Sequence, residues 1–376
     1  MANRGHPRIA LALVVIGSIV TFVAIFSIWA NRQALNTDNW VDTSGKLLQS
    51  KAVDEQLADY LGEQVFTGEL AKEKLEEVLP PRLSPLAGVV AGGIHQLAPK
   101  VAERALENPK VQELWEAANR KAHERLLEVL DGGGSTLSTE HGEVTLDLAA
   151  LVTQISSEIG VGGGIAEKIP PDAGKLTILR SDQLSLAQTG AHVVRELPIF
   201  LTLLALVLFG VAVYIAGPRR RRTLRAVGFG FIVAGLLALI LRGMGGNVLV
   251  DSLVANPAAK PAVHDVWDIA TSLLVTIAAS ALTFGILVVL GAELAGQTRP
   301  AVWLREKAAP YIHEQRAAAY GVGLVVFLLL IWLAPVAAFR KPLGLLVFAV
   351  LFAVGLELLV RQTLREFPAV EKPAAD

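Results

Sequence analysis

The fold is decided by the stretch from Ile9 to Ala30, IALALVVIGSIVTFVAIFSIWA, which runs for 22 residues without a charged side chain. A helix rises 1.5 Å per residue, so about 20 such residues cross the roughly 30 Å of hydrocarbon in a bilayer. Arg4 and Arg8 precede the stretch, as in a signal peptide, but a signal core is only about 7–15 residues long. Ile28 would also place a bulky side chain at the −3 position of a cleavage after Ala30. The sequence therefore predicts an uncleaved membrane anchor.

Five further apolar runs of similar length occupy the second half of the chain. They span Leu197–Ala216, Thr223–Leu241, Ile269–Leu290, Tyr320–Phe339 and Leu343–Val360. The hydrophobic share of 53% is close to that of soluble domains, so it is the clustering of apolar residues that indicates a membrane protein. We expect an all-α membrane protein with six transmembrane helices.

The basic residues of the short loops predict the orientation of these helices. With the N-terminus inside, the inner segments (1–8, 217–225, 293–319 and 361–376) hold 14 Lys and Arg residues. The short outer segments (242–268 and 340–342) hold four. Positive residues concentrate in cytoplasmic loops. Both termini are therefore expected in the cytoplasm of a plasma-membrane protein, with residues 31–196 outside.

The long segment between the first two spans is predicted to be a folded extracytoplasmic domain. Residues 32–196 carry 16 Lys and Arg against 25 Asp and Glu, an acidic balance that suits export. Ser50 and Asn108-Pro109 are typical helix starts, and Asp131 with the glycines after it is a typical helix end. Further helices are expected at Glu69–Leu79, from Ser84-Pro85, and at Leu148–Ile159. We expect a mainly helical domain.

A small β element is also expected in this domain. Thr136–Thr139 and Glu143–Asp147 flank His141-Gly142 and are typical of a short hairpin. The segment Lys175–Arg180 could supply a third strand.

These features divide the chain into four parts. They are the cytoplasmic N-terminus and anchor (1–30), the extracytoplasmic domain (31–196), a five-helix bundle (197–360) and a cytoplasmic tail (361–376). Helical composition also continues upstream of two spans, from Asp182 to Ala216 and from Pro261 to Leu290. Both stretches are therefore predicted to be continuous helices that extend beyond the bilayer and could act as stalks for the outer domain.

Several packing motifs of the outer domain occur together. They comprise Asn39-Trp40-Val41, Lys46-Leu47-Leu48, Trp115, Ala118, Ala122-His123, Leu126-Leu127, Leu130, the segment Gly142–Leu148 and Ile169-Pro170. With them the chain resembles a group of actinobacterial multi-pass integral membrane proteins over most of residues 9–310. The resemblance implies an anchor helix, an outer helical domain and a C-terminal helical bundle. It does not indicate any biochemical activity.

Catalytic motifs are absent from the sequence. There is no His-Glu-x-x-His, no Gly-x-Ser-x-Gly and no cysteine, and the Gly-rich segment 160–164 lacks the Lys-Ser/Thr of a phosphate loop. We therefore predict no enzyme activity, no catalytic, metal or cofactor-binding residues and no cofactor.

Three groups of ionisable residues were weighed as sites. His264, Asp265 and Asp268 have metal-like spacing but form an incomplete ligand set, so a solvated helix start is favoured. Glu357 near a span end is interpreted as a helix-face partner of Arg361, and an ion-coupling role is the alternative. His123 is interpreted as a packed or capping histidine.

Three function classes remain open from the sequence. The first is a non-enzymatic envelope protein whose outer domain binds a protein partner or ligand while the bundle sits in the lipid bilayer. The second is a transport or channel component, and the third is an enzyme with a site at the outer membrane face. The missing motifs and the nearly charge-free spans favour the first, and no nucleic-acid partner is expected.

Overall fold

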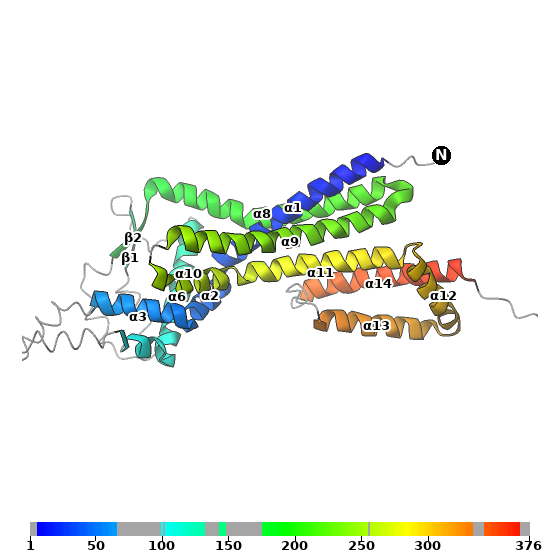
Figure 1. Cartoon of the computed structure of the whole chain (residues 1–376). Coiled ribbons are helices and arrows are strands. Elements are labelled where there is room, and N and C mark those ends of the chain that lie inside the picture. Colours follow the sequence, from blue (N-terminus) through cyan, green and yellow to red (C-terminus); the bar gives the residue numbers. More distant parts are fainter. Residues whose placement is uncertain are drawn as a thin grey trace, which may run out of the picture. The chain divides into compact units, whose positions relative to one another are not determined.

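The computed structural model describes residues 6–65, 99–100, 102–131, 143–147, 175–254, 256–333 and 342–368. Over these residues the chain is built mainly of α-helices with one small β-ladder (Figure 1). The predicted helices at Glu69–Leu79, from Ser84, and at Leu148–Ile159 lie outside the described residues. The same holds for the strand expected at Thr136–Thr139.

Four of the described helices are long and apolar enough to cross a membrane. They are α1 (Pro7–Ala34), α8 (Ser181–Ile215), α9 (Arg220–Leu253) and α11 (Ser272–Leu294). Each contains most of one of the first four apolar runs of the sequence. The chain is therefore a membrane protein. The last two runs correspond to α13 (Arg316–Leu333) and α14 (Pro342–Glu366), of which α13 is a shorter apolar helix.

The chain divides into two compact units, each with its own packing. The unit that contains most of the apolar helices comprises Met1–Trp29, Glu196–Arg242 and Leu273–Asp376, and we call it the membrane unit. The other comprises Ala30–Arg195 and Gly243–Ser272, and we call it the polar unit.

Small residues set the packing of the membrane unit. Ala234 and Ala238 of α9 are buried against Leu274 and Ala278 of α11, and Ile25 of α1 joins the same cluster. Small residues allow membrane helices to approach closely. The small residues of the third apolar run therefore form a contact between α9 and α11 within this unit.

Gly228 of α9 and Gly285 of α11 mark a close crossing of these two helices. A Cβ atom added to Gly285 would lie 2.6 Å from the carbonyl oxygen of Gly228, and one added to Gly228 would lie 2.8 Å from that of Gly285. Neither distance is possible for a real side chain. Both positions therefore require glycine.

The membrane unit also contains a tight turn, an aromatic cluster and an amphipathic helix. The turn from α8 into α9 is a 3₁₀ turn, Gly217–Arg219, in which Gly217 has a φ of 55°, a left-handed conformation that favours glycine. An aromatic cluster joins α11, α13 and α14, where Phe327 stacks on Phe348 at 5.4 Å between ring centroids. The amphipathic helix α12 (Arg299–Glu314) packs against both α13 and α14.

The polar unit is built from shorter helices. They are α2 (Thr37–Gln49), α3 (Lys51–Val65), α6 (Pro109–Leu130) and α10 (Lys260–Ala270), and α2 contacts each of the other three. Asn108 caps α6 by accepting the N–H of Lys110 at 2.9 Å, and Asp131 ends it, as the sequence predicted. The first part of α8 packs on α6, where Gln188 donates to the carbonyl oxygen of Val129 at 2.9 Å.

The β element is a two-stranded antiparallel ladder of β1 (Glu143–Asp147) and β2 (Lys175–Arg180), with an irregularity between Val144 and Thr145. The sequence placed Glu143–Asp147 in a local hairpin with Thr136–Thr139. Its partner among the described residues is Lys175–Arg180, the segment expected as a third strand, about 30 residues further along the chain.

One of the two predicted continuous helices is confirmed and the other is wrong. The stretch from Asp182 lies in the single helix α8, which includes Pro198. The stretch from Pro261 is broken at Thr271, which ends α10 with φ −98° and ψ 5° before α11 begins at Ser272. The Thr271 hydroxyl donates to the carbonyl oxygen of Trp267 at 2.6 Å, a bond that competes with the regular helix pattern.

Candidate functional site: an acidic pocket

The turn between α2 and α3 forms one wall of a pocket in the polar unit. Ser50 stands between the two helices, and its hydroxyl oxygen accepts the backbone N–H of Val53 at 3.4 Å. The same hydroxyl donates to Asp265 of α10 at 2.6 Å. Ser50 therefore starts α3, as predicted, and also ties the turn to α10. Asp54 follows in the first turn of α3.

The facing wall comes from the segment that leads into α6. Helical residues 102–106 place Glu103 on this wall, and Glu107 follows before the cap at Asn108. Leu106 is buried against Leu48 of α2 and Ala58 of α3, so an apolar contact holds the two walls together.

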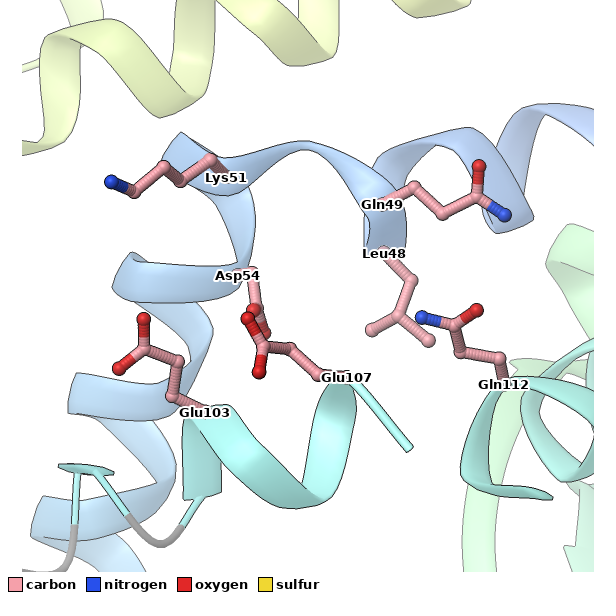
Figure 2. Close-up of a pocket in the computed structure, with 7 residues that line it drawn as sticks. All are labelled: Leu48, Gln49, Lys51, Asp54, Glu103, Glu107 and Gln112. Atoms are coloured by element: carbon pink, nitrogen blue, oxygen red, sulfur yellow. The ribbon is translucent and has the colours of Figure 1, made fainter. Parts of the chain in front are cut away.

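The two walls enclose a pocket of about 420 Å³. Its described lining residues are Leu48, Gln49, Lys51, Asp54, Glu103, Glu107 and Gln112 (Figure 2). Three of the seven are carboxylates, whereas Lys51 is the one cation among them. Figure 2 shows the ammonium group of Lys51 pointing away from the carboxylates, and this group lies 3.5 Å from Glu55. The carboxylates of the pocket are thus left without a neutralising cation among the described lining residues.

Asp54 is the most constrained of these carboxylates. The residue is only 8% exposed, and its Oδ1 atom is buried without a hydrogen-bond partner among the described residues. Burial raises the pKa of Asp54, and the negative charges of Glu103, Glu107 and Glu55 raise it further. A buried acceptor that lacks a donor is unfavourable, and nearby like charges increase the cost. A positively charged hydrogen-bond donor would therefore be favourable in this pocket.

The lining residues define the chemical groups that the pocket offers. The seven described lining residues include no serine, cysteine or histidine that could act as a nucleophile or a near-neutral base. No group of three or more His, Asp or Glu residues is arranged to hold a metal ion in the described part of the chain. What the pocket offers is an apolar contact at Leu48, amide groups at Gln49 and Gln112, and negative charge.

His123 has the packed position that the sequence favoured. It is 2% exposed on α6 and stacks on the ring of Trp40 at 5.1 Å. Its Nε2 lies 3.1 Å from the carbonyl oxygen of Ala34, and its Nδ1 lies 3.1 Å from the hydroxyl of Thr37. Since a carbonyl only accepts, Nε2 carries a proton, and in the neutral ring Nδ1 accepts from Thr37. The two nitrogens thus join α6 to the last residue of α1 and to the first residue of α2.

The histidine and aspartates of α10 do not converge on one point. His264 Nδ1 lies 3.3 Å from Asp268, one helical turn further on, whereas Asp265 accepts the hydroxyl of Ser50. The structure thus gives Asp265 a role in joining α10 to α3.

Glu357 pairs with Arg361 one turn along α14, as predicted, and it also accepts the hydroxyl of Tyr320 from α13. The contact with Tyr320 was not foreseen, because nothing in the sequence places α13 beside α14 in that register.

A buried arginine of the membrane unit was also missed. Arg305 of α12 is 3% exposed, and it donates to Glu366 at the end of α14 and to the carbonyl oxygen of Leu294 at the end of α11. This side chain joins the ends of α11 and α14 to the middle of α12.

The pocket itself was not foreseen from the sequence. The one available signal was Asp54, because it stands between Val53 and Leu57 on the predicted amphipathic helix, beside its apolar face. Glu103 and Glu107 come from a segment whose position relative to α3 is set only by the fold.

Comparisons with protein-family models, with curated proteins and with solved structures found no match for this chain.

Proposed function

We propose that this chain is a non-enzymatic membrane protein of the cell envelope, in which the polar unit binds a partner or envelope component and the apolar helices anchor it. The observation that carries this proposal is the pocket of about 420 Å³ with the buried, unpaired carboxylate of Asp54. Pockets for small ligands range from about 300 to 1,000 Å³ and combine apolar walls with a few fixed polar groups. The acidic pocket has that size, and Leu48 is the apolar residue among its seven described lining residues.

The proposal includes six membrane spans. α13 and α14 complete the set, with the apolar composition of Tyr320–Phe339 and Leu343–Val360 as support. Six spans with the basic segment Arg219–Arg225 inside put both termini in the cytoplasm and residues 31–196 outside. The pocket then faces the exterior of the plasma membrane.

The topology is tested by cysteine labelling, for which this cysteine-free chain is well suited. Glu113→Cys places a thiol at an exposed position of α6, and Thr298→Cys places one at the exposed start of α12. An impermeant thiol reagent added to intact cells should label the first variant and not the second. Labelling of the Thr298 variant alone would overturn the orientation.

The binding role is tested by crosslinking in living cells. A photoreactive residue replaces Gln49, which is exposed at the pocket, and a matched variant carries it at Thr298. We expect a discrete adduct from position 49 and a different pattern, or none, from position 298. Identical patterns from both positions would contradict a binding role for the pocket.

A further inference from the structure

We infer that the acidic pocket binds an alkylammonium group, carried by a free aliphatic amine or by a lysine side chain of a partner. This inference rests on the proposed binding function of the polar unit and specifies the chemistry of its ligand. The steps below use only the described residues that line the pocket.

Charge is the first step. Asp54, Glu103 and Glu107 line one pocket, and Lys51 points away from them toward Glu55 (Figure 2). Like charges held close together destabilise one another unless a counter-ion lies between them. The group that completes the pocket is therefore positively charged.

Hydrogen bonding is the second step. The Oδ1 atom of Asp54, in the first turn of α3, is buried and unpaired among the described residues. A native protein rarely leaves such an acceptor without a donor. An ammonium group carries three donors and no acceptor, so it can serve Asp54 and a neighbouring glutamate together.

Size and shape are the third step. Mg²⁺ and Ca²⁺ require several oxygen ligands at about 2.0–2.6 Å, and the described acidic residues form no such group. A cavity of about 420 Å³ also exceeds the space that one bare ion occupies. The side chain of Leu48 adds an apolar surface to the pocket, against which an alkyl chain can pack. An ammonium group on an alkyl chain fits both the charged wall and the apolar wall.

The test uses the full-length protein in detergent at low salt and pH 7, with thermal stability and calorimetry as readouts. The probes are spermidine as a free amine, a short lysine-containing peptide, and MgCl₂ at matched ionic strength. We expect spermidine, the peptide or both to bind saturably and raise the melting temperature, and MgCl₂ to do neither. Equal stabilisation by MgCl₂ would mean charge screening only and would overturn the inference.

Substitutions of pocket residues test whether the amine binds in the pocket. Asp54→Asn and Glu107→Gln should each weaken amine binding at least tenfold, because each removes a charge from the pocket. Asp42→Asn is the matched control, since Asp42 is exposed on α2 and pairs with Lys46 at 2.6 Å outside the pocket. Unchanged affinity in both pocket variants would overturn the inference, and Glu107→Gln keeps the test valid if Asp54→Asn fails to fold.

The two probes separate the two sources of the ammonium group. Tighter binding of spermidine than of the peptide identifies a free amine as the ligand, and the reverse identifies a lysine of a protein partner. If neither probe binds while crosslinks still form at position 49, the ligand class is wrong and the proposed function stands. If no crosslinks form at position 49 either, the proposed binding function is contradicted together with the ligand class.

Discussion

The membrane unit and the polar unit hold their helices together with different kinds of contact. In the membrane unit, serine hydroxyls such as those of Ser18 and Ser280 bond to Val14 and Thr276 of their own helix, and small residues form the contact of α9 with α11. Polar bonds across helices of this unit occur at Arg305 and at Tyr320. In the polar unit side chains bond across helices. Trp115 of α6, for example, donates to the carbonyl oxygen of Ser44 of α2 at 3.2 Å.

This difference follows from the solvent of each unit. Hydrocarbon offers no hydrogen bonds, so polar groups in a membrane helix are satisfied locally and helices associate by close fit. In water, polar contacts between helices are compatible with solvent and can fix their register. The membrane unit should therefore be sensitive to added volume, and the polar unit to lost hydrogen bonds and misplaced charge.

The largest expected effect is that of proline in the polar part of α8. Ala191→Pro removes a backbone donor within the helix, next to Gln188, whose side chain bonds to Val129 of α6. We expect a loss of about 3 kcal/mol or more, measured as a lower melting temperature in detergent.

The matched control is Lys51→Pro. Lys51 is the first residue of α3, where the backbone donor is not used, and Ser50 before it is extended with φ −76° and ψ 121°. Proline is tolerated at such a position. If both prolines were tolerated equally, residues 182–196 would not form the helix that packs on α6.

Added side-chain volume in the membrane unit should have the next largest effect on thermal stability. Gly285→Leu forces a side chain against the backbone of Gly228, so we expect a loss of about 1–3 kcal/mol in thermal unfolding. Gly291→Leu on the same helix meets no atom within 4 Å and should be nearly neutral. Leucine favours a helix equally at both positions. Comparable losses in both variants would therefore contradict the close fit of Gly285 as the cause.

A smaller effect is expected from Asp54, and it depends on pH. Because the pKa of Asp54 is raised above its usual 3.8, the folded ligand-free protein favours the protonated form. This contribution to stability is present below the ordinary pKa and is lost as the pH rises through the raised value. The charged residues around Asp54 are Lys51, Glu55, Glu103 and Glu107.

Asp54→Asn should therefore melt higher than the wild type at pH 7, by about 2–4 °C, which corresponds to about 1 kcal/mol in a domain of 150–250 residues. The advantage should disappear toward pH 3, where Asp54 itself is protonated. Asp42→Asn serves again as the control and should show no such gain. A lower melting temperature for Asp54→Asn at pH 7 would mean that the carboxylate is structural rather than poised for a ligand.

The smallest effect is expected at Glu357. This carboxylate pairs with Arg361 and accepts from Tyr320 on an exposed helix face, and exposed ion pairs contribute about 0–1 kcal/mol. Glu357→Gln should leave thermal stability and growth nearly unchanged. A growth defect equal to that of a deletion, with normal protein levels, would favour a transport role over an envelope-binding role.

The helices were predictable from local sequence because their signals are local. Charge-free length indicated α1, α8, α9 and α11, and caps at Ser50 and Asn108 indicated the starts of α3 and α6. The break at Thr271 was not predictable, because no glycine or proline is present between Pro261 and Gly285.

Features that join distant segments could not be predicted. Alternation of side chains marked Glu143–Asp147 as a strand, but it does not specify which strand pairs with it. The acidic pocket depends in the same way on the approach of Glu103 and Glu107 to Asp54, which no spacing in the sequence records.

The crossing of Gly228 and Gly285 also limits what can move through the membrane unit. With no room for even a methyl group between the two backbones, the seam between α9 and α11 is closed to water, to hydrated ions and to lipid chains at that point. A permeation route along this seam is therefore blocked by main chain, which cannot rotate aside as a side chain can. Any conduction through the bundle would have to follow another pair of helices or require α9 and α11 to separate.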